Sequence, residues 1–417
     1  MKTKIFHVSE KPNIKIAVRN VRLGYLISFL GQMSFTLSLW YVFGEQFRGW
    51  DPFQIFILFG VGWQLSFIFE VPMGFLADKF GRLRVFRASK LIVAVSYVVI
   101  GLSTNFTLLA LAMLANAIGS AGISGSIEPV IGLSLGSVGE EDKIQKYQGH
   151  SFAISRIGRL IALILAPFLY RFWPPLIFLA YSVVCILSFF VSFKVKDVGH
   201  YEENSEMNII KHLKQTIIIV KSKPGLTLAM FAGLSSLNTE TVWFLMQPLG
   251  LNLGLSESKI SLLFMVSVLI TSAGAFMVHK IKDVKNKMGL VIIYNIFCNI
   301  LGCLILLNFN NIYALIFVVA FTAISVGLYS PLIQTYFQHN MKKSNLSTCI
   351  SIYYFVASLS LIFMNIVIGR VLKNQGLAAQ LKINIIFGII CLVLAVPLIV
   401  RSRKDNKPIK GSVIPAE

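Results

Sequence analysis

The sequence predicts an all-α protein that crosses a membrane about twelve times, and its composition and apolar runs predict this class. The chain has 417 residues, of which 56% are hydrophobic and 13% are charged, and its mean hydropathy is +0.74. A water-soluble domain of this size does not tolerate such a composition. Apolar runs of about 18 residues or more recur along the whole chain, and each can cross a hydrocarbon core of about 30 Å as a helix.

The predicted spans share an apolar composition and a length that suits the bilayer. They are residues 21–43, 53–76, 88–104, 106–135, 149–170, 173–193, 225–249, 257–279, 288–308, 312–337, 346–371 and 382–400.

The net charge of +20 could indicate a nucleic-acid partner, so the placement of the charges matters. If the N-terminus is cytoplasmic, 30 of the 38 Lys and Arg residues fall on the cytoplasmic side, in loops and terminal segments. This is the positive-inside distribution of membrane proteins. It predicts a multi-pass protein of the cell membrane with both termini in the cytoplasm, and it argues against a nucleic-acid partner.

Residue types that carry catalysis are sparse. The five cysteines lie within or at the edges of predicted spans, and none has metal-ligand spacing with a histidine, so no metal or cofactor is expected. No Walker sequence occurs, and all six histidines lie in loops or at span edges. The chain is therefore not expected to be an enzyme.

The longest hydrophilic interruption divides the spans into two blocks of six. We expect an N-terminal half over residues 1–193, a cytoplasmic linker over 194–223, a C-terminal half over 224–402 and a cytoplasmic tail over 403–417. Apolar residues recur in the linker at helical spacing, which predicts an amphipathic helix. This helix would either lie on the inner leaflet or serve as a solvated connector.

A short pattern recurs in both halves and indicates duplication. Trp40 precedes Gly49-Trp50-Asp51, and Trp243 precedes Gly254-Leu255-Ser256, each just before an even-numbered span. Asp51 and Ser256 are also good N-cap residues, so helix capping explains both sites equally well.

Residues 74–84 read Gly-Phe-Leu-Ala-Asp-Lys-Phe-Gly-Arg-Leu-Arg, in a loop that the charge distribution places in the cytoplasm. This segment resembles the loop 2–3 signature of the major facilitator superfamily, with the last basic residue displaced by one. Glu70-Val71-Pro72, residues 124–128, and Trp243 with Gln247-Pro248 also look like a bacterial, efflux-like branch. The resemblance implies two six-helix halves and transport by alternating access.

The loop motif is expected to act as a conformational latch, with plain positive-inside anchoring as the alternative. Its residues are Gly74, Asp78, Lys79, Gly81, Arg82 and Arg84. Gly74 would let a neighbouring helix approach, and Gly81 would let the chain reverse. The resemblance implies that Asp78 faces a helix start near residues 345–348. Arg82 would then pair with an acid, and Glu140, Glu141 and Asp142 are available.

Four ionisable residues are predicted inside the membrane at one depth: Glu70, Glu128, Arg156 and Arg159. They lie about 7–10 residues from the cytoplasmic ends of their spans, or roughly 10–15 Å deep. A charge in hydrocarbon costs about 2.5–3.5 kcal/mol on insertion scales, so each needs a partner. We expect Glu128 to pair with at least one arginine, in either a structural or a functional role.

Glu240 is predicted near mid-membrane, two residues after Asn238 and with no basic neighbour in its own half. The resemblance implies that spans 1, 4, 7 and 10 line a central cavity, which makes Glu240 a candidate proton carrier or cation-recognising group. A hydrogen bond to a neighbouring helix is the alternative. The other cavity candidates are Gln32, Trp40, Asn116, Trp243, Gln247, Tyr329 and Gln334. Aromatic and amide groups suit amphipathic solutes, although tryptophans near span ends also anchor helices at the interface.

The chain departs from many drug–proton antiporters of this superfamily at two places. Ala115 stands where span 4 would carry an arginine, and span 5 offers only Ala166-Pro167 in place of a Gly-Pro-x-x-Gly-Gly run. Arg156 or Arg159 could replace the missing charge. We expect a monomeric exporter of small amphipathic compounds with proton coupling. Uptake of a sugar, amino acid or peptide is the alternative, and a transport-inactive receptor or scaffold is the alternative of another class.

The prediction for Glu240 is that Glu240→Gln abolishes proton coupling, because the amide cannot take up and release a proton at neutral pH. Proton movement into proteoliposomes during solute flux measures this directly. Unchanged coupling in the variant would reject Glu240 as the proton carrier.

Overall fold

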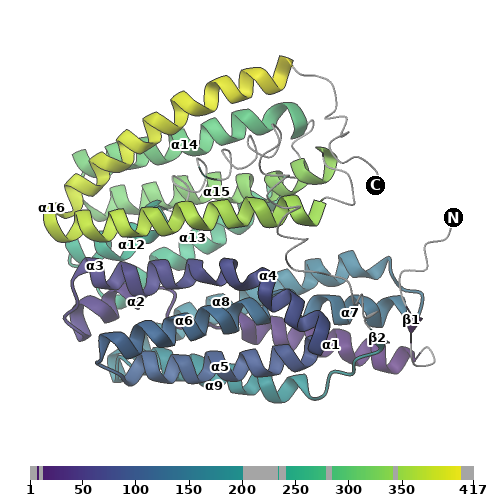
Figure 1. Cartoon of the computed structure of the whole chain (residues 1–417). Helices are drawn as coiled ribbons and strands as arrows, with labels where there is room; N and C mark the ends of the chain where they lie inside the picture. Colours follow the sequence, from purple (N-terminus) through teal and green to yellow (C-terminus); the bar gives the residue numbers. More distant parts are fainter. Residues whose placement is uncertain are drawn as a thin grey trace. The chain divides into compact units, whose positions relative to one another are not determined.

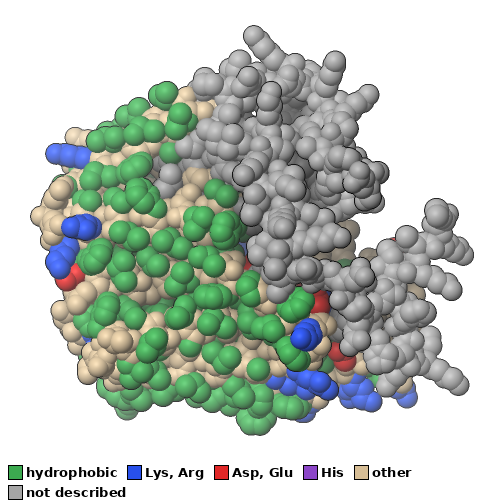
Figure 2. Space-filling model, in the orientation of Figure 1, with side chains coloured by type: hydrophobic (Ala, Val, Ile, Leu, Met, Phe, Trp, Pro, Cys, Tyr) green, Lys and Arg blue, Asp and Glu red, His purple; other side chains and the backbone are tan. Residues whose placement is uncertain are grey.

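The computed structural model describes residues 7–8, 13–200, 233, 241–278, 284–340 and 346–404 (Figure 1). The chain divides into two compact units, one of residues Met1–Phe43 and Gly62–Ile209, the other of Gly44–Val61 and Ile210–Glu417. Within the described residues, eight helices are long and apolar enough to cross a membrane. Hydrophobic side chains cover much of the face in Figure 2, as a surface in contact with lipid requires.

The first unit consists of helices and one minimal strand pair. Its helices are α1 (Ile14–Gly31), α2 (Trp40–Val42), α4 (Gly62–Phe80), α5 (Arg82–Leu102), α6 (Phe106–Ile123), α7 (Ile127–Gly136), α8 (Lys143–Phe172) and α9 (Leu176–Ser192). The strands β1 (His7–Val8) and β2 (Gly199–His200) pair antiparallel, which the sequence did not predict.

The second unit contains the start of the second predicted span and the described C-terminal helices. Its elements are α3 (Pro52–Ile55), the π-helix η2 (Phe56–Val61), α12 (Thr241–Asn252), α13 (Glu257–Met277), α14 (Val284–Asn308), α15 (Ile312–Asn340) and α16 (Leu346–Lys404). A second π-helix, η1 (Phe43–Phe47), crosses the boundary between the units. In α16, Gly376 has φ 81°, so two helices meet there. Most of the predicted linker helix lies outside the described residues.

Two predicted spans are broken rather than continuous. The first, expected over 21–43, ends as a helix at Gly31, and the chain turns until α2 begins at Trp40. The polar side chains of Ser34 and Thr36 meet at 3.1 Å within this turn. The fourth, expected over 106–135, is interrupted between α6 and α7, where Gly125 has φ 66°. A left-handed residue ends an α-helix whatever the hydropathy of its neighbours.

The pattern shared by the two halves has the same backbone geometry in both places. Gly49 and Gly254 both have φ 67°, and each lies two residues before an extended N-cap residue. Asp51 forms a full capping box with Gln54, as expected, with bonds of 3.0 and 3.1 Å. Ser256 occupies the N-cap of α13 without a side-chain cap bond.

Helices of the first unit approach closely at small residues. A Cβ at Gly119 would lie 3.0 Å from the Ser89 carbonyl oxygen, and one at Gly122 would lie 2.1 Å from the Ser89 hydroxyl. Helix α6 therefore packs closely against α5 at these two glycines. Between α8 and α1, a Cβ at Gly158 would lie 2.4 Å from the Phe29 carbonyl oxygen. Lipid tails cover apolar side chains as well as another helix does, so the hydrophobic effect does not drive helices together inside the membrane. Close van der Waals packing at small residues therefore holds the helices together.

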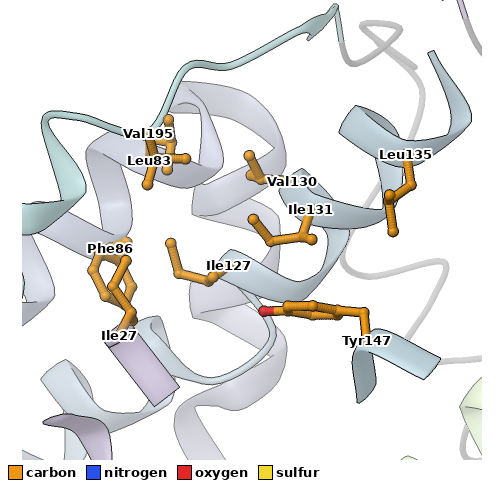
Figure 3. Packing of buried hydrophobic residues seen from close by; sticks show 9 residues of the cluster. All are labelled: Ile27, Leu83, Phe86, Ile127, Val130, Ile131, Leu135, Tyr147 and Val195. Atoms are coloured by element: carbon orange, nitrogen blue, oxygen red, sulfur yellow. The ribbon is translucent and has the colours of Figure 1, made fainter. Parts of the chain in front are cut away.

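Buried side chains join several elements of the first unit at one place (Figure 3). The cluster contains Ile27, Leu83, Phe86, Ile127, Val130, Ile131, Leu135, Tyr147 and Val195. It therefore connects α1, α5, α7 and α8 with the chain that follows α9. The side chain of Asn20 fastens the same region, because its amide donates to Ser134 and to the Lys196 carbonyl, each at 2.8 Å.

Residues 44–61 pack within the second unit, although the sequence assigns them to the first half. A Cβ at Gly369 on α16 would lie 3.0 Å from the Phe53 Cα, and one at Gly60 would meet Asn365. Lys373 donates to Asp51 at 2.9 Å. Burial opposes ionisation of Asp51, but Lys373 and backbone N–H groups outweigh it and hold its pKa below the ordinary value. The contact therefore stabilises the protein above the ordinary aspartate pKa and is lost as the pH falls.

The α1–α8 contact makes a testable prediction about stability. Gly158→Ala should lower the free energy of unfolding by about 1–3 kcal/mol, because its Cβ meets backbone that cannot rotate away. Thermal unfolding of the purified protein measures the effect. Gly149→Ala on the same helix is the matched control, since nothing lies within 4 Å of its Cβ position among the described residues. Equal unfolding temperatures for the two variants would contradict the packing argument.

Candidate functional site

Four aromatic residues of the first unit form a continuous cluster beside the break in the first span. The rings of Trp40 and Trp63 lie 5.4 Å apart, and those of Tyr97 and Tyr181 lie 4.6 Å apart, both edge to face. The Tyr97 hydroxyl connects the pairs, because it lies close to the side chains of Trp63 and of Thr36 in the broken segment. We refer to Trp40, Trp63, Tyr97 and Tyr181 as the aromatic cluster.

Arg159 extends the aromatic cluster with a charged group. Its guanidinium donates a short hydrogen bond to the Gln32 side chain, at the C-cap of α1, and it lies within electrostatic range of Tyr181. Trp40 is fully buried, whereas Trp63, Tyr181, Gln32 and Arg159 are each only partly buried. The site therefore combines ring faces, an amide and a cation, with part of each of four side chains still accessible.

The four predicted intramembrane charges are not joined to one another by ion pairs in this structure. Arg156 lies over the Phe152 ring at 4.5 Å, and Arg159 binds the neutral Gln32. Glu128 is exposed on α7, beyond the break in span 4, and makes no ion pair with either arginine among the described residues. The expected Glu128–arginine pair is therefore not formed, because the break displaces Glu128 from the straight helix that the prediction assumed.

Arg82 of the loop motif, expected to act in a latch, has partners that differ from the expected ones. Arg82 pairs with Asp78 of its own motif at 2.7 Å and donates to the Gly125 carbonyl oxygen at 3.0 Å. Glu140, one of the acids expected to bind Arg82, pairs with Lys143 at 2.5 Å instead. Asp78 and Arg82 lie on either side of the turn at Gly81, so the nearer acid takes the guanidinium. We call Asp78, Arg82 and Gly125 the latch.

Glu70, on α4, contacts the same break in span 4. Its carboxylate accepts a hydrogen bond of 3.2 Å from Ser124, the residue before Gly125. The Ser126 hydroxyl donates to the Gly122 carbonyl oxygen at 2.6 Å and covers one end of α6. Two predicted site residues, Glu70 and Arg82, thus converge on one three-residue break that sequence reasoning had treated as continuous helix.

The remaining motif residues behave differently from one another. Gly81 has φ 94° at the N-cap of α5, which confirms the predicted chain reversal. No atom of the described residues lies within 4 Å of a Cβ at Gly74, so the close helix contact expected there is absent. Lys79 lies over the Phe80 ring at 5.4 Å, and Arg84 is exposed. Asn345, expected near Asp78, lies outside the described residues.

The other cavity candidates are spread over several helices. Tyr329 meets Tyr353 hydroxyl to hydroxyl at 2.5 Å, and Trp243 packs edge-on against Phe244 and Phe264 at 5.1 and 5.5 Å. Gln247 is buried. Asn116 is also buried, and its side-chain oxygen has no hydrogen-bond partner within the described part of the chain. Glu240, Asn238 and the side chain of Gln334 lie outside the described residues.

Lys90 is a membrane-embedded charge that sequence reasoning missed. Lys90 is only the third residue of the span predicted over 88–104, so it was grouped with the charges of the cytoplasmic loop, but α5 begins at Arg82 and places Lys90 two turns into the helix. Its side chain is 2% exposed, with the ammonium 5.5 Å from the Phe86 ring centre and within electrostatic range of Cys185. Gly81 of the loop motif marks the start of α5, and this glycine was the signal that could have placed Lys90 inside the membrane.

The fold, with eight described helices long and apolar enough to cross a membrane, defines a multi-pass helical membrane protein. A sequence model described as Major Facilitator Superfamily matches residues 22–292 and 228–413. The chain belongs to the major facilitator superfamily, and it is a transporter of that family. No curated protein matches the sequence significantly.

Solved structures of transporters share the fold at low sequence identity. The nucleoside transporter NupG is 13% identical with a TM-score of 0.71, and the match covers 94% of this chain and 100% of that one. A POT family transporter in complex with a thioalcohol-conjugated peptide is 12% identical (TM-score 0.72; 96% and 99%). A D-xylose–proton symporter is 13% identical (TM-score 0.67; 92% and 96%). The predicted fold class is thus confirmed.

The latch makes a prediction about transport. Arg82→Gln should slow solute flux by up to about fivefold, because an exposed ion pair contributes about 0.2–1 kcal/mol and 1.4 kcal/mol is a factor of ten. Flux in proteoliposomes at matched protein content measures it. Arg84→Gln is the control, since Arg84 is exposed in the same motif. Flux that falls equally in both variants would assign the motif to charge anchoring.

Proposed function

We propose that the protein exports small amphipathic solutes across the cell membrane by alternating access. The observation that carries this proposal is the aromatic cluster, which lies beside the Arg159–Gln32 contact at the break in the first span. Ring faces hold an apolar body, and the amide and guanidinium hydrogen-bond a polar end. A site with both kinds of group suits a solute that also has both.

The broken first span supports a solute site in the same place. Transporters bind their solutes where membrane helices are discontinuous, because a helix end offers backbone groups that are not used within the helix. Here α1 ends at Gly31, within reach of Arg159 through Gln32. The solute would therefore meet the end of a helix, a cation and aromatic rings together.

The proposal extends to orientation and energy source. We place the protein in a bacterial cell membrane, and the positive-inside distribution supports cytoplasmic termini there. Proton coupling through Glu240 and release of the latch during the transport cycle complete the proposed mechanism. Asp78–Arg82 is exposed, and exposed ion pairs contribute only about 0.2–1 kcal/mol, so the latch can open without a large energy input.

The prediction for direction uses vesicles of opposite orientation. A fluorescent amphipathic solute should accumulate in inside-out vesicles that contain the protein and leave right-side-out vesicles, and Trp63→Ala should reduce the rate about tenfold through loss of ring contact. Phe172→Ala is the matched control, because Phe172 is 86% exposed at the end of α8.

Three outcomes of this experiment distinguish the functions that the sequence left open. Accumulation in right-side-out vesicles would establish uptake, as for a sugar, amino acid or peptide. An absence of solute-dependent flux in both orientations would instead indicate a receptor or scaffold that has kept the fold. Equal rates in Trp63→Ala and Phe172→Ala would show that the aromatic cluster does not contact the solute.

A further inference from the structure

Arg156 and Arg159 form a pair of positive charges near the middle of α8. They are three residues apart, so they lie on neighbouring parts of the helix surface, and Arg156 is close enough to repel Arg159. The helix runs from Lys143 to Phe172, which places both residues far from either end. Each charge at this depth costs about 2.5–3.5 kcal/mol on insertion scales.

No acid within the described part of the chain compensates for this pair. Its acids have other positions or partners: Asp78 binds Arg82, Glu140 binds Lys143, Asp51 binds Lys373 and Glu70 accepts from Ser124. The contacts of Arg159 and Arg156 are a neutral amide and an aromatic ring, Gln32 and Phe152. A guanidinium has five N–H donors, so one bond to Gln32 leaves Arg159 with unused capacity.

Lys90 provides a contrast within the same unit. Its side chain is almost completely buried, so a solute has no access to its ammonium. Arg156 and Arg159 are only partly buried, and Arg159 binds Gln32 and lies within electrostatic range of Tyr181 in the aromatic cluster. The two accessible charges, Arg156 and Arg159, are thus the ones near the aromatic cluster, whereas Lys90 is inaccessible.

We propose that the transported solute carries an oxyanion, a carboxylate or a phosphate, which binds Arg159 and Arg156 while its apolar body lies against the aromatic cluster. This inference rests on the proposed function and names the solute class for the same site. Arginine suits this task, because its planar fork of donors matches the two oxygens of a carboxylate or phosphate. The oxyanion would supply the negative charge that the neighbouring side chains lack.

Thermal unfolding of the purified full-length protein tests the proposal without any flux measurement. The probes are phenylacetate, its neutral analogue phenylacetamide, and phenyl phosphate. A ligand that binds the folded state raises the unfolding temperature as its concentration increases, which gives an apparent affinity. We expect one or both anions to stabilise the protein and phenylacetamide to have no effect. The two anions distinguish a carboxylate site from a phosphate site.

Variants assign the effect to the two arginines. Arg159→Gln and Arg156→Gln should each weaken anion binding about tenfold or more, because each removes a charged hydrogen bond. Arg159→Lys keeps the charge and should retain part of the affinity, which separates loss of binding from loss of folding. Lys146→Gln is the matched control, since it removes one exposed charge from the same helix.

Several results would overturn the proposal. These are equal stabilisation by phenylacetamide and phenylacetate, no stabilisation by either anion, or an anion response that survives in both arginine variants. Arginine-dependent stabilisation by phosphatidylglycerol in phosphatidylcholine nanodiscs, without any response to soluble anions, would also overturn it and would assign the arginines to a lipid headgroup. Reversed flux in the vesicle experiment would refute export while leaving the anion site intact.

Discussion

Hydrocarbon cannot hydrogen-bond a free backbone amide or carbonyl, and the arrangement of this protein follows from that constraint. Wherever a helix is broken inside the first unit, a specific side chain lies at the break. Gln32 and Arg159 meet at the end of α1, while Glu70 and Arg82 reach the interruption around Gly125. Arg82 binds a backbone group directly, the Gly125 carbonyl oxygen, whereas the other two contacts join side chains beside the helix ends. Polar side chains are therefore placed where the helices stop.

The same constraint explains how much could be predicted from the sequence. Apolar runs predicted helices such as 257–279 and 312–337 closely, because every residue in them contributes to the hydropathy that defines a span. The breaks at Gly31 and Gly125 were missed, since a single backbone angle does not alter a hydropathy average. The Arg159–Gln32 contact could not be predicted either. Both residues were candidates, but 127 positions separate them in the sequence, and only the packing of α8 on α1 brings them together.

Charge in this protein is handled in two physically different ways. Lys90 is almost completely buried, with its ammonium over the Phe86 ring of its own helix. Asp78 and Arg82 are accessible and paired, so their attraction is weakened by solvent and easily exchanged for another partner. The sequence showed the types of these residues but could not distinguish the two situations, because the difference lies in what surrounds each side chain.

The π-helices η1 and η2 flank residues 48–55 and have a consequence for chain register. A π-turn holds an extra residue relative to an α-turn, so its presence shifts the phase of everything that follows by about 100°. Within η2, this phase places Gly60 against Asn365. Phe53, in the helix α3 that precedes η2, lies against Gly369. A single-residue deletion there would leave a regular helix with the wrong face towards α16. Insertions and deletions in this short segment therefore alter which side chains meet, even where the helix itself survives.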